Sequence, residues 1–206
     1  MRKTTKAYHV TAKTNLDGIM VEGLRPLAKN RPKELKVADS VFDIAARRLG
    51  VQHRRIGLFA WPNTEPAITD QSAIIEVDIN AIIARVFHQA WIDLAWGMIE
   101  GIFARLLPGP MRNIESLIEH DIEKLFKEIK NIQVYEGFIG DVLLELAMLY
   151  WGTGIRLIDY NKETAQALNQ KVIEQQRRFQ GLMPGLGHEV ALGVEIIKPD
   201  RIRIVE

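Results

Sequence analysis

Residues 7–27 read AYHVTAKTNLDGIMVEGLRPL, and their apolar spacing changes from a repeat of two to a helical repeat. In an extended segment Tyr8 and Val10 face one side. His9 and Thr11 then face the other side. The opening therefore predicts a strand on which an imidazole and a hydroxyl share one face.

A short helix is predicted directly after this strand. Thr14 or Asn15 can cap its first turn, because both side chains accept hydrogen bonds from free backbone N–H groups. Gly23 can end the helix in a left-handed conformation before the chain leaves through Pro26. The apolar residues at helical spacing are Leu16, Ile19 and Met20.

Four later stretches continue the same organisation. Residues 56–63, IGLFAWPN, predict an aromatic strand, and residues 73–79, AIIEVDI, predict a strand that ends in an acidic residue. Near the C-terminus, residues 187–192, GHEVAL, place Glu189 at the start of a strand, and residues 197–202, IKPDRI, follow it.

In this order the segments resemble the ADP-ribosyltransferase superfamily. That family opens with a Y/F-H-x-T strand and a helix ending in I…GL.P, and it closes with a glutamate at the start of a late strand. The aromatic strand is similar to the F-Y-F-x-P strand of the DNA-modifying ADP-ribosyltransferase toxins. The resemblance covers residues 7–85 and 186–205, and it implies an α+β fold, a split β-sandwich that carries a helical insertion.

The resemblance also implies residue roles in a site for NAD, which this family uses as a substrate. His9 and Thr11 would hydrogen-bond the ribose and nicotinamide regions, and Glu189 would be the catalytic carboxylate. Glu195 and Glu76 are its rivals. Phe59 and Trp61 alternate on the aromatic strand, so either could stack on nicotinamide, although core packing explains one of them equally well.

A catalytic arginine precedes the aromatic strand in the DNA-modifying toxins. Arg47 and Arg48 correspond to it roughly, and Arg47 is preferred. Both also suit the last turn of a helix, where positive charge favours the helix dipole. That helix is predicted to begin with Asp39 or Ser40 as its cap and to end at Gly50.

Composition narrows the chemistry further. The chain of 206 residues is 47% hydrophobic, long enough for one domain, and it contains no cysteine. Thiolate catalysis, disulfides and cysteine-ligated zinc are therefore excluded. The five histidines lack the spacing of a metal site, so we expect none. No segment looks like a signal peptide or a membrane span, and we expect a cytoplasmic protein.

Charge is divided unevenly along the chain. Residues 1–60 hold 13 Lys and Arg against 5 Asp and Glu, whereas the remainder holds 14 against 21. A basic N-terminal part suits a pyrophosphate, and it also suits a nucleic-acid acceptor. An ordinary solvated basic surface explains it too. The residues expected around a cleft are Arg25, Lys29, Arg31, Lys33, Arg54 and Arg55.

The middle of the chain has no counterpart in these motifs. Residues 80–107 are strongly apolar, residues 112–131 form a clear amphipathic pattern, and helices are predicted over 138–151 and 161–179. We therefore expect one domain, with residues 1–85 and 186–206 as its core and 86–185 as a mostly helical insertion. Its helices could join two copies, bind a partner protein, or cover the cleft.

The sequence thus predicts NAD-dependent ADP-ribosyl transfer to a macromolecular acceptor, with DNA or RNA as the first expectation. An RNA 2′-phosphotransferase, which belongs to the same superfamily and uses NAD, is one alternative. Another is a catalytically silent interaction module on this fold. Fold alone does not decide among them.

Overall fold

The computed structural model describes residues 5–26, 33–52, 55, 57–62, 69–79, 84–106, 133–134, 137–176, 187–194 and 196–205. Over these residues the fold is α+β, with five α-helices and two antiparallel sheets. A small hairpin, β5 (Gln133–Val134) and β6 (Gly137–Phe138), stands apart from both sheets. Short 3-10 turns occupy Lys13–Asn15, Leu157–Asp159 and Pro199–Arg201.

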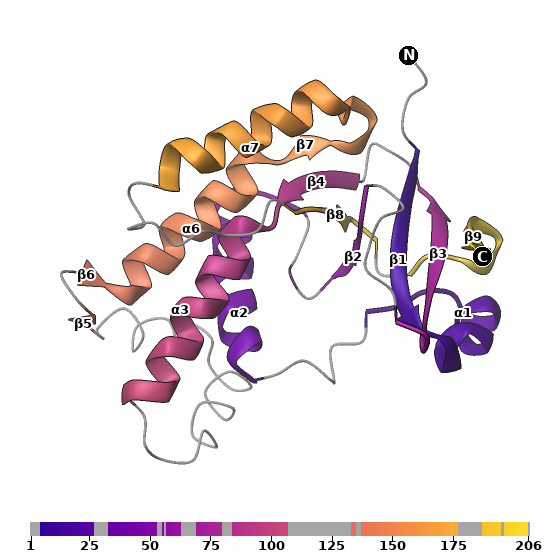
Figure 1. Ribbon diagram of the computed structural model, residues 1–206, viewed down its shortest axis with the longest axis horizontal. Coiled ribbons are helices and arrows are strands. Elements are labelled where there is room, and N and C mark those ends of the chain that lie inside the picture. Colours follow the sequence, from indigo (N-terminus) through magenta and orange to yellow (C-terminus); the bar gives the residue numbers. More distant parts are fainter. Residues whose placement is uncertain are drawn as a thin grey trace.

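The first sheet carries the opening strand. Its order is β1 (Lys6–Ala12), β3 (Ser72–Asp78) and β9 (Ile202–Val205), all antiparallel. Burial alternates along β3, as it does on a strand with one face in the core. Helix α1 (Leu16–Glu22) lies beside this sheet at one end of the molecule (Figure 1).

The second sheet carries Glu189. Its order is β2 (Leu58–Ala60), β8 (His188–Leu192), β4 (Ala84–His88) and β7 (Ile155–Arg156). β8 pairs with β4 over its whole length, and β2 pairs with its C-terminal half. The late glutamate strand is therefore central in the sheet.

The two sheets meet along β1 and the end of β2. Tyr8 and Trp61 exchange two backbone hydrogen bonds, of 2.8 and 2.7 Å between nitrogen and oxygen. Leu24 and Ile197 form a second bridge of this kind, next to β9. These contacts fix β1, which carries His9, relative to β2, which pairs with β8.

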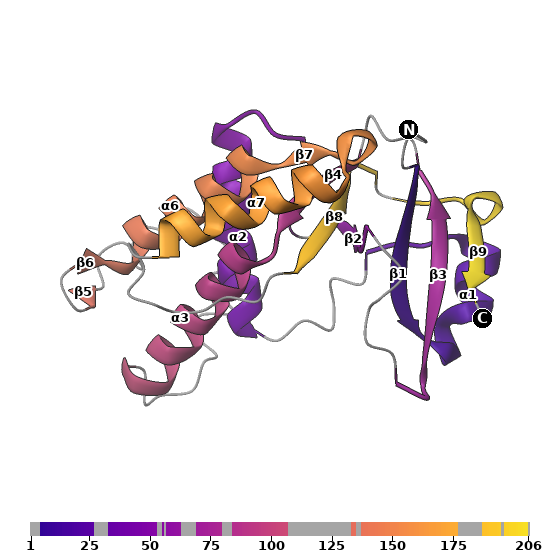
Figure 2. The ribbon, with the colours of Figure 1, turned by 45° about the horizontal axis from the view of Figure 1, so that its top comes forward.

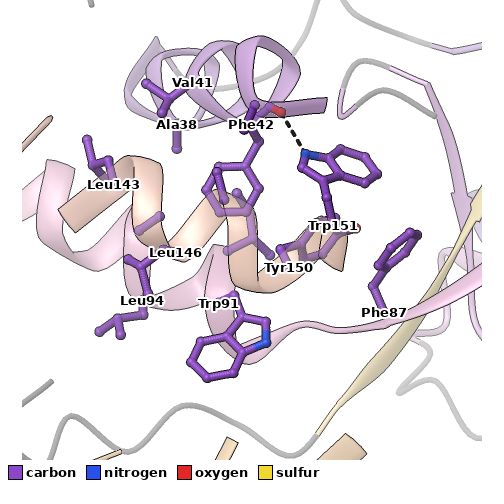
Figure 3. Packing of buried hydrophobic residues seen from close by; sticks show 14 of the residues in the cluster. Ala38, Val41, Phe42, Phe87, Trp91, Leu94, Leu143, Leu146, Tyr150 and Trp151 are labelled. Carbon is purple, nitrogen blue, oxygen red and sulfur yellow. Dashed lines mark hydrogen bonds between the residues drawn. The ribbon is translucent and has the colours of Figure 1, made fainter. Parts of the chain in front are cut away.

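Helices form a layer against the second sheet. α2 (Lys33–Arg48), α3 (Ala90–Leu106) and α6 (Ile139–Thr153) pack on one another, while α7 (Lys162–Gln176) runs beside β4 and β7 (Figures 1 and 2). Figure 3 shows the core of this layer, where Trp151 donates its indole N–H to the carbonyl oxygen of Phe42 at 2.6 Å.

Most elements predicted around the motifs are confirmed. The opening strand, its helix, the aromatic strand, the Glu189 strand and the helix near 138–151 are all present. The prediction that α2 begins at Asp39 or Ser40 is wrong, because the helix begins at Lys33 and encloses both residues. The amphipathic stretch 112–131 lies outside the described residues. The segment 86–185 also supplies β7 and most of β4.

Gly23 is required by a close approach between segments. Its φ is +89°, and a Cβ atom there would lie 2.4 Å from the carbonyl oxygen of Ile197.

We expect Gly23→Ala to lower the free energy of unfolding, measured in urea, by about 2–3 kcal/mol through backbone strain and this clash. Gly18→Ala is the control. Gly18 lies in α1 with open space around its Cβ position, so helix propensity should stabilise the protein by about 0.5–1 kcal/mol. Equal changes in the free energy of unfolding for Gly23→Ala and Gly18→Ala would contradict the close approach between Gly23 and Ile197.

Candidate functional site

Glu189 points from β8 toward the helical layer, and its carboxylate is buried. It pairs with Phe87 across the strands, so the two side chains share this face of the sheet. Arg55 Nη1 donates to Glu189 Oε1 at 2.5 Å, and the hydroxyl of Tyr150 donates to the same oxygen at 2.8 Å. Arg55 Nη1 also donates to the Tyr150 oxygen at 2.8 Å. The three groups form a closed triangle of hydrogen bonds.

Arg55 is the charged centre of this cluster. Its side chain is 2% exposed, and its Nε donates to Asp39 Oδ1 at 3.3 Å. Its backbone N–H donates to Asp43 Oδ1 at 2.5 Å, which ties the segment to α2. Burial alone would lower the pKa of the guanidinium, but Glu189, Tyr150 and Asp39 together outweigh it and the pKa is raised. Arg55 is therefore held as a cation between two carboxylates.

Aromatic rings surround the guanidinium. Its Cζ lies 4.1 Å from the centroid of the Phe59 ring, 5.4 Å from Tyr150 and 5.6 Å from Trp96. The indole Nε1 of Trp96 is buried and has no hydrogen-bond partner in the described part of the chain. The cation is thus packed by π faces, and one unused donor lies in this aromatic shell.

His9 joins the same region through the aromatic strand. Its Nδ1 lies 2.8 Å from the carbonyl oxygen of Phe59. A carbonyl only accepts, so Nδ1 carries the proton and Nε2 is left as an acceptor. Burial lowers the pKa of His9, which favours this neutral form at pH 7. Phe59 therefore contacts His9 with its backbone and Arg55 with its ring.

The other residues singled out in the sequence lie in different places. Thr11 is buried on the same face of β1 as His9, where Asn15 donates to its hydroxyl at 3.4 Å. Trp61 is half-buried and pairs with Tyr8 at the junction of the sheets. Arg47 is exposed in the last turn of α2, so the arginine that the structure brings to Glu189 is Arg55 instead.

Glu76, one of the two rival carboxylates, does not share this cluster. Glu76 pairs with Tyr8 across β1 and β3 and accepts from Lys6 Nζ at 2.7 Å, on the face opposite His9. Glu195 lies outside the described residues. The expected basic rim also changes, because Arg55 is buried in the ion pair rather than exposed. Arg25 is exposed as expected. The other four side chains of that rim, those of Lys29, Arg31, Lys33 and Arg54, lie outside the described set.

Sequence reasoning missed Asp43, Tyr150 and Trp96, and it missed the roles that Asp39 and Arg55 have in the cluster. One signal was present, since Asp39 and Asp43 are four residues apart and so share one face of a helix. Two carboxylates on a largely apolar helix face call for a nearby cation. Nothing local marks Tyr150, which reaches Glu189 only through tertiary packing.

A second polar group lies on the reverse face of the sheet. His88 and His188 pair across β4 and β8 with ring centroids 5.0 Å apart, and Tyr160 contacts His188 Nδ1 at 3.0 Å. The N–H of Ala90 donates to His88 Nδ1, so the proton of neutral His88 is on Nε2 and that nitrogen is not available to a metal. Among the described residues no three His, Asp or Glu side chains gather as metal ligands.

Asp93 lies in the first turn of α3, three residues before Trp96. Burial raises its pKa to about 6, and the charge of Glu189 adds to the rise while Arg55 opposes it. The folded protein therefore holds a proton here that the unfolded chain releases above pH 3.8, and stability should fall as pH rises from about 4 to 6.

Asp93→Asn should remove this fall. We expect a gain of about 1 kcal/mol in the free energy of unfolding at pH 7, reduced from the full shift because the side chain is partly exposed to water. Urea unfolding at pH 4.5 and pH 7 measures it. Asp17→Asn, an exposed first-turn aspartate of α1, is the control and should give no gain. A pH-independent effect of Asp93→Asn would contradict the assignment.

Comparison with known proteins adds no name to this geometry. No family model, curated protein or solved structure matches the chain. In the described residues we also find no helix with the length and apolar character that crossing a membrane requires. The functional argument therefore rests on the site itself.

Proposed function

We propose that this protein transfers ADP-ribose from NAD to a macromolecular acceptor. One observation carries the proposal. The strand with His9 and the strand with Glu189 are joined through Phe59, whose carbonyl binds His9 and whose ring packs on the arginine that holds Glu189. The sequence resemblance predicts this pairing of an early histidine with a late glutamate, and nothing local in the sequence requires it.

The chemistry needs a fixed anion beside a ribose. In the transfer, the bond from ribose C1′ to the nicotinamide nitrogen breaks with its electron pair, and nicotinamide leaves. Positive charge develops on the ribose, and the acceptor then bonds to C1′ and loses a proton. A carboxylate preorganised out of bulk water stabilises such charge far better than a mobile one. Glu189 fits this role because two donors hold one of its oxygens.

His9 and the aromatic residues supply binding. With Nδ1 on the Phe59 carbonyl, His9 Nε2 can accept a hydrogen bond from a ribose hydroxyl. Trp96 offers a buried indole N–H that can donate to an amide oxygen such as that of nicotinamide. The ring of Phe59 is already packed against Arg55, so we propose that nicotinamide stacks on the ring of Trp61 instead.

We keep nucleic acid as the first acceptor to test. The excess of positive charge in residues 1–60 favours a phosphate backbone, and phosphate contacts make binding fall steeply with salt. Transfer to DNA or RNA should therefore drop between 50 and 200 mM salt by about tenfold or more. Nicotinamide release from NAD alone should change less, because a dinucleotide meets fewer charges.

The test is incubation with NAD labelled in its adenylate phosphate, together with DNA, RNA or cell protein in separate reactions. We expect free nicotinamide and label on the nucleic-acid fraction. Label on protein alone would keep the transferase and reject the nucleic-acid acceptor. Loss of a 2′-phosphate from RNA would favour the phosphotransferase alternative. No nicotinamide release above a heat-denatured control, with any acceptor, would reject the enzyme and leave an interaction module.

A further inference from the structure

Tyr150 is the one member of the triangle that comes from the helical layer. It lies on α6, within the segment for which the sequence predicts assembly, partner binding or a lid. Its hydroxyl donates to Glu189 Oε1 and accepts from Arg55 Nη1, each at 2.8 Å. The other carboxylate oxygen, Glu189 Oε2, has no hydrogen bond within the described part of the chain.

The ring of Tyr150 is held on several sides. It stacks on Phe87 with centroids 4.6 Å apart and planes at 17°, and it meets the edge of Phe42 at 5.4 Å. Trp151, the next residue, anchors α6 to α2 through the Phe42 carbonyl (Figure 3). The side chain of Tyr150 is completely buried, so its hydroxyl cannot move away from Glu189 without disturbing this packing.

Packing alone does not explain the hydroxyl. A phenylalanine would fill the same aromatic space, whereas a buried hydroxyl must be hydrogen-bonded to offset the water it has lost. Burial also raises the pKa of Tyr150 well above its ordinary value, so the hydroxyl keeps its proton as a donor. What this donor does is fix the rotation of the Glu189 carboxylate, because it engages the same oxygen as Arg55.

We propose that Tyr150 is a positioning residue that holds Glu189 Oε1 so that Oε2 is presented to the ribose of NAD. It touches neither NAD nor the acceptor. This inference rests on the proposed function, and it makes the helical layer part of the catalytic apparatus. Arg55 supplies the positive charge that pairs with Glu189. Tyr150 supplies a second hydrogen bond, and the two bonds together fix the orientation of the carboxylate.

The first test compares two tyrosine to phenylalanine substitutions. Tyr150→Phe should lower kcat for nicotinamide release from NAD by about tenfold to a hundredfold, while KM for NAD stays within about twofold. Tyr160→Phe is the matched control, since its hydroxyl contacts His188, the neighbour of Glu189 on the opposite face. The Tyr160→Phe variant should keep the kcat and the KM of the unchanged protein. Equal kcat values for the two variants, or a change in KM alone, would overturn the inference.

A second measurement does not depend on turnover. Urea midpoints of Tyr150→Phe, Glu189→Gln and the double variant form a cycle, and groups in one hydrogen-bond network should give non-additive shifts. The same cycle with Tyr160→Phe should be additive. If the wild-type protein releases no nicotinamide, the proposed function fails. If the Tyr150 cycle is additive, the positioning role fails, whatever the activity.

Discussion

Replacing Arg55 with leucine is expected to lower the free energy of unfolding by about 3–5 kcal/mol. The guanidinium is 2% exposed and serves Glu189 and Asp39 together. Without it, two carboxylates lose the cation that lies between them, in a place that water scarcely reaches. The loss is larger than that of an exposed ion pair, which is worth about 0–1 kcal/mol. Urea unfolding followed by tryptophan fluorescence measures it.

The matched control is Arg47→Leu, which removes the same kind of side chain from an exposed position. Its expected cost is below about 1 kcal/mol, the size of a helix-dipole contribution. Adding Glu189→Gln to Arg55→Leu should recover part of the stability, because one stranded charge is then gone. Similar costs for Arg47→Leu and Arg55→Leu would show that the ion pair is not buried in solution.

Replacing Glu189 with glutamine is expected to slow nicotinamide release by at least about a hundredfold. Glutamine keeps the shape and can still accept from Tyr150 and Arg55, but the negative charge that faces the developing cation is lost. The readout is the initial rate of nicotinamide release at saturating NAD. Circular dichroism and the urea midpoint must show that the variant is folded before the rate is interpreted.

Glu76→Gln is the control for this prediction. Glu76 contacts Lys6 and Tyr8 on the outer face of its sheet, so its replacement should leave the rate within about twofold. Full activity in Glu189→Gln together with loss in Glu76→Gln would move the catalytic assignment to β3. Full activity in both would direct attention to Glu195.

Local patterns predicted the elements because their physical causes are local. The alternation in residues 7–11 depends on strand geometry alone, because successive side chains of a strand point to opposite faces. The burial of Ala73, Ile75 and Val77 likewise follows a repeat that can be read directly. These features identify strands, whereas the orders β1-β3-β9 and β2-β8-β4-β7 come from long-range pairing.

The composition of the site could not be predicted in the same way. Asp39 has the residue type of a helix cap, and that reading fails because α2 continues for six residues before it. Arg55 is one of four arginines between 47 and 55, and its burial beside Glu189 depends on tertiary packing. Tyr150 lies 39 residues before Glu189, so their contact is invisible to any local repeat.

Glu189 and His188 are neighbours on strand β8, so their side chains face opposite sides of the sheet. The position of Glu189 therefore depends on the register of this strand. If the strand slipped by one position against β4, every side chain would change face. In one direction of slip His188 would take the place of Glu189, and Glu189 would take that of Val190 on the reverse face, opposite Val86. A single inserted or deleted residue within this strand would therefore move Glu189 off the face that carries Arg55, whereas a change of two residues would keep its face.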